Sequence, residues 1–328
     1  MPEREGLIGR PAFNPPTMRI LILLAPLLVG LSSFAGEPQT VRLLAIGNSF
    51  TRNATNHLDD LAQAGGHTLI LNPLIIGGSS LQRHAEKAQK NEADPEDESG
   101  LYSNGRGLKD NLTADAWDFV TIQQVSMQSH DRGTYQPHAG WLRDFIAKHA
   151  PTAKLLVHQT WAYRKDDPRF TKPSDDPGEP TTQEQMYRGL TEAYDAIATE
   201  LGGRVIPVGD AFYAADTDPA WGYQVPESSD TNTLQPPALP AQPHSLHVGW
   251  FWRKLNAQDA GKDNQPPTLV MDGHHANLAG EYLGACVWYE VLFAESPVGL
   301  THIPKGLDAD YARFLQETAH RAVTARGD

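Results

Sequence analysis

Cysteine is almost absent from this chain of 328 residues. The single one, Cys286, lies within the apolar run YLGACVWYEVLF, so no disulfide can form within the chain. No basic residue adjoins Cys286 that would lower the pKa of its thiol, so we expect a small buried side chain there. These facts exclude a disulfide-stapled scaffold and give no support to catalysis by cysteine.

Basic residues are scarce relative to acidic ones. Lys and Arg number 27 against 40 Asp and Glu, which gives a formal net charge of -13 at pH 7. A surface of this sign repels the phosphate backbone of DNA and RNA. We therefore expect no nucleic acid partner.

The sequence also lacks a good membrane span. Its main candidate, the apolar stretch from Ile20 to Leu31, is short, follows a basic start and ends near small residues. This pattern is typical of a secretory signal peptide that is cleaved after Ala35, and a signal anchor is the alternative. We expect residues 1–35 to be an extended N-terminus and signal peptide. The mature protein is then secreted or periplasmic, with no stable membrane anchor.

Short apolar runs alternate with longer amphipathic segments along the rest of the chain. The runs that predict strands are 41–47, 67–75, 118–123, 153–159 and 204–209. Amphipathic segments follow most of these runs, which is typical of a parallel sheet with helices on both faces. The clearest predicted helix follows Thr182, which has capping-box spacing to Gln185, and ends at Gly202.

Residues 36–328 are expected to form a single domain. Acidic or proline-rich stretches interrupt the alternation, and they predict long loops at 91–110, 164–182 and 216–268. The third loop carries several aromatic side chains, so we expect it to pack over something.

Small polar residues end the first predicted strand. In LLAIGNSFTRNATNHL, the apolar run stops at Gly47-Asn48-Ser49 and a helix is expected to begin. At the carboxyl edge of a parallel sheet, such a turn faces the crevice where open α/β folds bind their ligands. A helix start also offers free backbone N–H groups to a developing negative charge. Ser49 is therefore a candidate nucleophile, although Asn and Ser can simply turn the chain and cap a helix.

An aspartate and a histidine lie three residues apart near the other end of the chain. In MDGHHANLAGEYLGACVW, Asp272 and His275 stand on an expected turn before an apolar helix, where both can face one point. A serine hydroxyl needs an imidazole to take its proton, and the imidazole needs a carboxylate to fix its tautomer. The spacing selects His275, with His274 as its rival.

Together the two motifs resemble those of the SGNH hydrolases, the GDSL-type lipase and esterase superfamily. The nucleophile block of that family is similar to Gly47-Asn48-Ser49, and its closing DxxH block is similar to Asp272 and His275. The resemblance implies a three-layer α/β/α sandwich with a flavodoxin-like parallel sheet of about five strands. It implies that Ser49 is the nucleophile, His275 the general base and Asp272 its orienting group, with no metal and no cofactor.

The resemblance also implies a backbone N–H and a side-chain amide that bind the oxyanion. NPLIIGGSSL offers Gly77 and Gly78 for the first, and we prefer Gly78. The family's GxND block is replaced here by TIQQVSMQSH. Because glutamine presents the same N–H donor as asparagine, Gln124 is the first choice for the second. The alternatives behind it are Gln123, Ser126 and Gln128.

The expected reaction is hydrolysis of a small-molecule or carbohydrate ester through an acyl enzyme. An O-acetylated sugar is preferred, because aromatic side chains can stack on sugar rings. The candidate aromatic residues are Trp161, Tyr163 and Trp250.

Two other functions stay open. The first is a catalytically silent carbohydrate-binding protein on the same fold. The second is a metal-dependent hydrolase, since the chain has 13 histidines. Its candidate zinc ligands are His158, His244, His247 and the histidines of DGHH.

Overall fold

The structure is a computed structural model that describes residues 37–226, 231, 233–253 and 267–327. The expected signal peptide, residues 1–35, lies outside the described residues. Those that are described belong to one compact unit. Within them, no helix is long and apolar enough to cross a membrane.

The five predicted strands form one parallel sheet. They are β1 (Thr40–Gly47), β2 (Thr68–Ile75), β3 (Phe119–Ile122), β4 (Lys154–His158) and β5 (Arg204–Ile206). Their order is β2-β1-β3-β4-β5, which is the flavodoxin-like order. The fifth strand is shorter than predicted, because Pro207 has no N–H for the ladder and a helix begins at Val208.

The strand order reverses beside β1, which pairs with β2 on one side and β3 on the other. In open α/β sheets, ligands bind outside the carboxyl ends of the strands at such a reversal. The residues that follow Gly47 therefore stand at the expected ligand edge.

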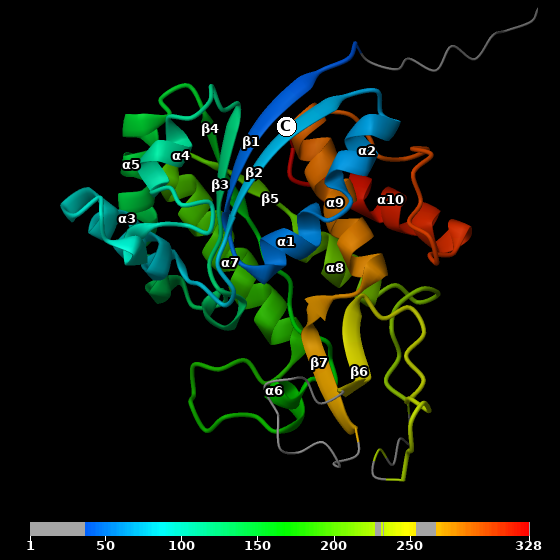
Figure 1. Ribbon diagram of the computed structural model, residues 1–328. Coiled ribbons are helices and arrows are strands. Elements are labelled where there is room, and N and C mark those ends of the chain that lie inside the picture. Colours follow the sequence, from blue (N-terminus) through cyan, green and yellow to red (C-terminus); the bar gives the residue numbers. More distant parts are fainter. Residues whose placement is uncertain (1–36, 227–230, 232, 254–266, 328) are drawn as a thin grey trace, which may run out of the picture. The chain divides into compact units, whose positions relative to one another are not determined.

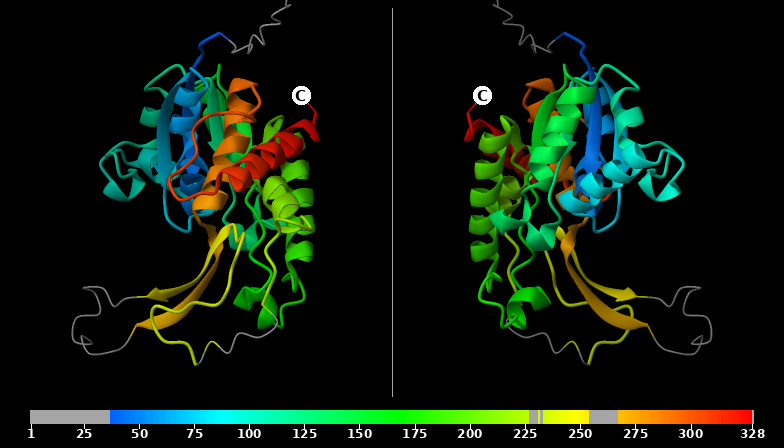
Figure 2. Two further views of the ribbon diagram at one scale, coloured as in Figure 1. Left: turned by 90° about the vertical axis from the view of Figure 1, so that its right-hand side faces the viewer. Right: turned by 90° about the vertical axis from the view of Figure 1, so that its left-hand side faces the viewer.

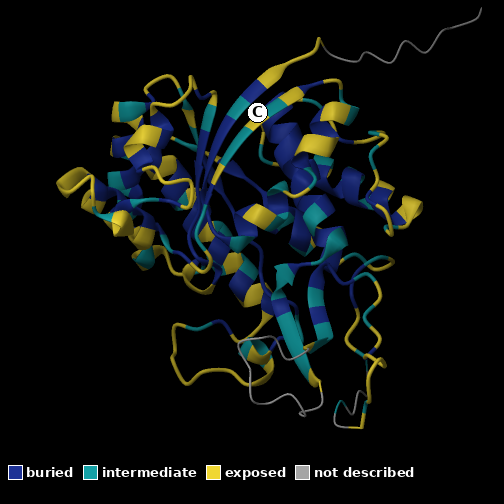
Figure 3. Ribbon diagram, in the orientation of Figure 1, coloured by how far each residue is buried: buried dark blue, intermediate teal, exposed yellow. Residues whose placement is uncertain are grey.

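Helices cover both faces of the sheet and complete three layers (Figures 1 and 2). One face carries α3 (Leu81–Ala93), α4 (Leu108–Leu112), α5 (His138–His149) and α7 (Gln183–Leu201). The other carries α1 (Ser49–Thr55), α2 (Leu58–Ala64), α8 (Val208–Asp216), α9 (Leu278–Phe293) and α10 (Ala309–Thr324). The predicted α/β/α fold class is thus confirmed, with a buried sheet at its centre (Figure 3).

Helix α9 is apolar apart from Glu281 and Glu290, and it is buried because it packs against α1, α2, α8 and α10. Cys286 lies in this helix and is fully buried, as expected. Burial raises the pKa of its thiol, so the side chain is an unreactive part of the core.

Helix α7 begins and ends where the sequence predicts. The hydroxyl of Thr182 accepts a hydrogen bond from the N–H of Gln185 at 3.1 Å. Gly202 ends the helix with φ of 65°, in the left-handed region that favours glycine.

A second, antiparallel sheet corrects two predictions. Strand β6 (His247–Arg253) pairs with β7 (Thr268–Ala276), at the carboxyl edge of the main sheet (Figure 1). The predicted loop 216–268 therefore contains a strand, and the DxxH motif lies on a strand instead of a turn. The reason is that β6 reads HVGWFWR, whose aromatic residues suit a strand despite the proline-rich segment before it.

The other two predicted loops are partly helical. Within 91–110, α3 runs to Ala93 and α4 begins at Leu108. The loop 164–182 contains the short helix α6 (Pro168–Thr171). Both segments otherwise connect the regular elements, as predicted.

Candidate active site

The GNS motif lies where β1 ends and α1 begins. Gly47 is the last residue of β1, Asn48 caps α1, and Ser49 is the first residue of the helix. A Cβ atom at position 47 would lie 2.2 Å from Oγ1 of Thr51, so only glycine fits there. The close packing produces a tight strand-to-helix turn that leaves Ser49 half-buried at the carboxyl edge of the sheet.

Asn48 fixes this turn from inside the protein. Its Oδ1 accepts hydrogen bonds from the N–H of Phe50 at 3.0 Å and from the amide of Gln123 at 2.8 Å. Its Nδ2 donates to the carbonyl oxygen of Ser79 at 3.0 Å. Because an unpaired buried polar group costs about 1–3 kcal/mol, these bonds hold one conformation of the turn.

Asp272 and His275 come from β7, and they contact each other twice. Nδ1 of His275 lies 2.9 Å from Oδ2 of Asp272, and the backbone N–H of His275 donates to Oδ1 at 2.9 Å. An ionised carboxylate only accepts hydrogen bonds, so Nδ1 carries the hydrogen and Nε2 is left as an acceptor. The carboxylate thus fixes both the tautomer and the direction of the ring.

The acceptor nitrogen of His275 faces Ser49. Its Nε2 lies 2.9 Å from Oγ of Ser49, although the two residues are 226 positions apart in the sequence. This is a hydrogen-bond distance. The structure therefore brings together the serine, imidazole and carboxylate that the two motifs predicted, in the geometry that serine acyl transfer requires.

The surroundings of Asp272 keep its carboxyl ionised. Burial alone would raise its pKa, but hydrogen bonds from the ring and backbone of His275, together with the neighbouring His274, hold the pKa of Asp272 well below its ordinary value. His274 lies on the same carboxylate, with Nδ1 at 3.1 Å from Oδ1. Burial lowers the pKa of His274. Asp272 is consequently an anion at neutral pH, and it accepts both hydrogen bonds from His275.

The glycine turn after β2 is hydrogen-bonded to the turn that carries Ser49. The N–H of Ile76 donates to the carbonyl oxygen of Gly47 at 3.0 Å, and Asn48 bonds Ser79. Between these contacts, Gly78 is exposed and has φ of 62°. Among the described residues, none accepts a hydrogen bond from the N–H of Gly78, so this group is available to a ligand.

The buried side chain of His84 contacts both of these turns. Its Nε2 lies 3.1 Å from the carbonyl oxygen of Gly47 and 2.7 Å from Oγ of Ser79. Its Nδ1 lies 2.9 Å from the hydroxyl of Tyr102. Burial lowers the pKa of His84 to about 4, so the ring is neutral at physiological pH. His84 is therefore a buried support for the turn that carries Gly78.

Gln124 is not free to act as the predicted oxyanion donor. Its Nε2 donates to the carbonyl oxygen of Thr134 at 2.9 Å and to its hydroxyl at 3.1 Å. Its Oε1 accepts from the N–H groups of Leu81 and Val125. The structure corrects this prediction: the longer side chain of glutamine turns into the fold and joins three segments there.

The alternatives to Gln124 are also engaged. Nε2 of Gln123 donates to Asn48, and its Oε1 accepts from the hydroxyl of Thr51. The hydroxyl of Ser126 lies 3.0 Å from that of Tyr163, and Gln128 is exposed. The side-chain donor of the GxND block therefore has no free counterpart among Gln123, Gln124 and Ser126.

Trp161 belongs to the core and not to an aromatic binding surface, so this prediction is wrong. Its ring is fully buried between Phe50 and Phe212, with centroid separations of 4.3 and 4.4 Å. Its Nε1 donates to the carbonyl oxygen of His274 at 2.8 Å. Trp161 thus supports the strand that carries His275.

The other two predicted aromatics differ in position. Tyr163 is buried, and its ring lies 5.3 Å from that of His274. Trp250 is half-buried on β6, where it pairs with Met271 of β7. Tyr163 therefore lies beside the strand that carries His275, and Trp250 lies on the hairpin.

The zinc ligand set considered as an alternative is not assembled. His158 contacts Thr51 and Gln123 in the core, and His247 contacts the carbonyl oxygen of Ala162. Burial lowers the pKa of both histidines to about 3. Within the described part of the chain, neither residue shares a ligand cluster with His244 or the DGHH histidines. The structure contradicts this set.

Sequence reasoning missed the supporting residues His84 and Asn48. One signal for His84 was available: it lies on the apolar face of α3 with Leu81 and Ala85, where an ionisable side chain is unusual. Asn48 was interpreted only as part of a turn. Its contact with Ser79 joins segments 31 residues apart, which spacing alone cannot indicate.

The fold and the site together define a three-layer α/β/α protein with a Ser-His-Asp arrangement at the carboxyl edge of its parallel sheet. This is the fold that the resemblance to the SGNH hydrolases predicted. More particularly, the chain belongs to the family described as a domain of unknown function, DUF4886, whose model matches residues 42–220.

Several solved structures are similar to this chain. A DUF4886 family protein from Bacteroides uniformis is 25% identical, with 88% of this chain and 96% of that chain covered and a TM-score of 0.65. A protein from Slackia heliotrinireducens assigned to the SGNH hydrolases is 22% identical, with 76% and 98% covered and a TM-score of 0.46. Est24, a carbohydrate acetylesterase from Sinorhizobium meliloti, is 16% identical, with 52% and 85% covered and a TM-score of 0.33. No curated protein matches the sequence.

Proposed function

We propose that this protein is a serine esterase. Oγ of Ser49 attacks the ester carbonyl carbon while Nε2 of His275 takes its proton. The tetrahedral intermediate expels the alcohol, which receives that proton, and leaves an acyl group on Ser49. Water then loses a proton to His275 and attacks the acyl carbon, and the acid is released as His275 returns the proton to Oγ of Ser49. The contacts of 2.9 Å from His275 to Ser49 and to Asp272 carry this proposal.

The oxyanion is expected to bind backbone N–H groups. The candidates are the N–H groups of Ser49 and Gly78. Neither group donates a hydrogen bond to a described residue. Two backbone donors are enough for a working oxyanion hole. This assignment keeps Gly78 as predicted and replaces Gln124 by the nucleophile's own N–H.

A short acyl group suits this site better than a long one. The ring of Phe50 lies 6.0 Å from that of His275 and is stacked on the buried ring of Trp161, so bulky core side chains stand close to His275. We therefore propose an acetyl or similarly small ester, with a carbohydrate as the alcohol. Trp250, half-buried on the hairpin, is the remaining candidate for stacking on a sugar ring.

Export is part of the proposal as well. The apolar stretch before Ala35 and its small residues support cleavage by a signal peptidase. N-terminal sequencing of the protein recovered from the producing cells tests this, because a mature chain that begins at Gly36 is expected.

Hydrolysis of p-nitrophenyl acetate and of acetylated sugars tests the function. Ser49→Ala is expected to lower the rate by at least about 10³-fold. Ser174→Ala, at an exposed position of the loop 164–182, is the matched control and should keep the wild-type rate. Equal turnover by Ser49→Ala would remove the serine mechanism, and no turnover of any ester by the wild type would favour a binding protein.

A further inference from the structure

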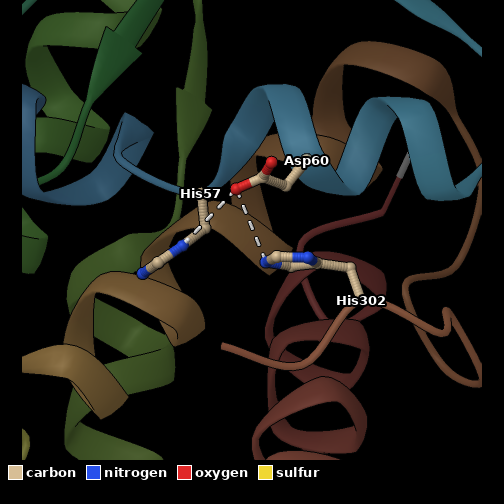
Figure 4. Close-up of side chains that lie close together, drawn as sticks. All are labelled: His57, Asp60 and His302. Carbon is tan, nitrogen blue, oxygen red and sulfur yellow. Dashed lines mark ion pairs between the residues drawn. The ribbon is translucent and has the colours of Figure 1, made fainter. Parts of the chain in front are cut away.

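A second cluster of polar side chains lies apart from Ser49, His275 and Asp272. His57 is the N-cap residue of α2, Asp60 lies in the first turn of that helix, and His302 lies in the connection between α9 and α10 (Figure 4). The two histidines approach Asp60 from different parts of the chain.

One carboxylate oxygen lies between the two imidazoles. Oδ2 of Asp60 is 3.8 Å from Nδ1 of His57 and 3.6 Å from Nε2 of His302. One ligand atom from each of the three residues lies within 4.8 Å of the other two. These distances are too long for hydrogen bonds. The three groups therefore converge without being bonded to one another.

The two separations from Asp60 are close to those between neighbouring ligands of a metal site. Zinc binds nitrogen and oxygen at about 2.0–2.2 Å in a tetrahedral arrangement, which puts neighbouring ligand atoms roughly 3.3–3.6 Å apart. The distance of 3.6 Å from Asp60 to His302 lies at the upper end of this range. The distance of 3.8 Å from Asp60 to His57 is slightly longer, and a small side-chain rotation can shorten it.

One imidazole nitrogen of the cluster is buried without a hydrogen-bond partner among the described residues. Nε2 of His302, the atom that faces Asp60, is buried and forms no hydrogen bond with any described residue. A cation between the two rings would satisfy a buried nitrogen that is otherwise unpaired.

Glu281, at the start of α9, supports His57 from the other side. Its Oε2 lies 3.9 Å from Nε2 of His57, and its carboxylate is held by the amides of Asn53 at 2.8 Å and Asn56 at 2.7 Å. At 3.9 Å the carboxylate does not hydrogen-bond the ring. Its negative charge nevertheless favours the hydrogen on Nε2, which leaves Nδ1 as the ligand atom.

We propose that Nδ1 of His57, Oδ2 of Asp60 and Nε2 of His302 bind one zinc ion. The side chain of Asp60 is 52% exposed, so water can supply the fourth ligand. Two imidazoles and one carboxylate suit zinc or cobalt, whereas calcium and magnesium prefer oxygen ligands. The ion would join the turn between α1 and α2 to the α9–α10 connection. The ion would stabilise the packing of these helices. It would not take part in the ester chemistry, which uses none of the three ligand residues.

Zinc binding and thermal stability test the proposal. The full chain is stripped with EDTA, exchanged into chelator-free buffer and titrated with ZnCl₂ in a calorimeter. One zinc per chain and a higher Tm are expected for the wild type. His302→Gln and Asp60→Asn are each expected to weaken binding by at least about tenfold. His320→Gln should bind as the wild type does, because among the described residues His320 contacts one carboxylate, that of Glu290 at 2.7 Å, and belongs to no cluster of three possible ligands.

A competing location is the cluster of Asp272, His274 and His275. Zinc that is retained by both His302→Gln and Asp60→Asn but lost in His274→Ala would overturn the proposal. So would a wild type that binds no zinc in the micromolar range. If His302→Gln fails to fold, Asp60→Asn decides, since this carboxylate is largely exposed.

CoCl₂ supplies a second signal, because tetrahedral cobalt absorbs visible light strongly. The absorption is expected in the wild type and not in Asp60→Asn. Metal-free protein should hydrolyse p-nitrophenyl acetate at the metal-loaded rate, measured where both forms are folded. Metal binding therefore tests the zinc proposal, and ester hydrolysis tests the esterase proposal, so that either can fail without the other.

Discussion

The buried ring of His84 is expected to make the protein less stable in acid. Its Nε2 faces the carbonyl oxygen of Gly47, which can only accept, so Nε2 carries the hydrogen and Nδ1 accepts from the hydroxyl of Tyr102. Protonation would bury a charge, and for this reason the pKa of His84 is lowered from 6.5 to about 4.

The direction of the effect follows from where the proton binds. The unfolded chain takes up a proton near pH 6.5, whereas the folded chain takes it up only near pH 4. Between these values the unfolded state binds more protons, so stability falls as the pH falls. With these two pKa values, acidification from about pH 6.5 to about pH 4.5 removes about 2 kcal/mol of the free energy of unfolding.

Urea unfolding at the two pH values measures this loss. Glutamine does not titrate, so His84→Gln, although less stable at the higher pH, should lose about 2 kcal/mol less than the wild type on acidification. Tyr102→Phe is the matched control, because it removes a partner of the ring but keeps the ring, and it should retain the acid loss. Equal acid losses in the wild type and His84→Gln would refute the reasoning.

Three further predictions concern the site and its surroundings. Asp272→Asn is expected to lower kcat for p-nitrophenyl acetate by about 10³–10⁴-fold, because an amide can donate to Nδ1 of His275 and select the wrong tautomer; a loss below tenfold would contradict its orienting role. Gly78→Ala is expected to lower kcat by about tenfold or more, since alanine is strained at φ of 62° and a shifted turn loses an oxyanion donor. Gly77→Ala, whose Cβ would meet nothing within 4 Å, is its control, and equal losses would count against a specific role for Gly78. Burial raises the pKa of Asp216 to about 6, so its ionised form destabilises the folded state at pH 7. Asp216→Asn should therefore be more stable than the wild type by about 1–3 kcal/mol at pH 7 in urea unfolding, a gain that shrinks as the pH falls towards 4; a gain that grows in acid would contradict this.

The main sheet could be predicted because its strands are short aliphatic runs that helices separate. The hairpin could not, because β6 follows a proline-rich segment and its register depends on pairing with β7. Local composition predicts an element when burial dominates it. It fails when a partner strand from elsewhere in the chain makes the element stable.

The serine, histidine and aspartate could also be predicted, because Ser49 directly follows a buried strand and the spacing of Asp272 and His275 lets both face one point. Gln124 could not be placed, since the direction of a long side chain is decided by the acceptors around it, here on Thr134. The cluster of His57, Asp60 and His302 depends on a connection far along the chain returning to α2, which no local pattern encodes.

Covalent labelling tests the central claim most directly. A fluorophosphonate reacts with a serine only when a neighbouring base activates it. Incubation with a small excess, followed by digestion and mass spectrometry, should find one label per chain on the peptide that contains Ser49, formed in step with the loss of ester hydrolysis. His275→Ala should slow the labelling by at least about 10³-fold. An active protein labelled elsewhere, or labelling of Ser49 at an unchanged rate in His275→Ala, would contradict the account.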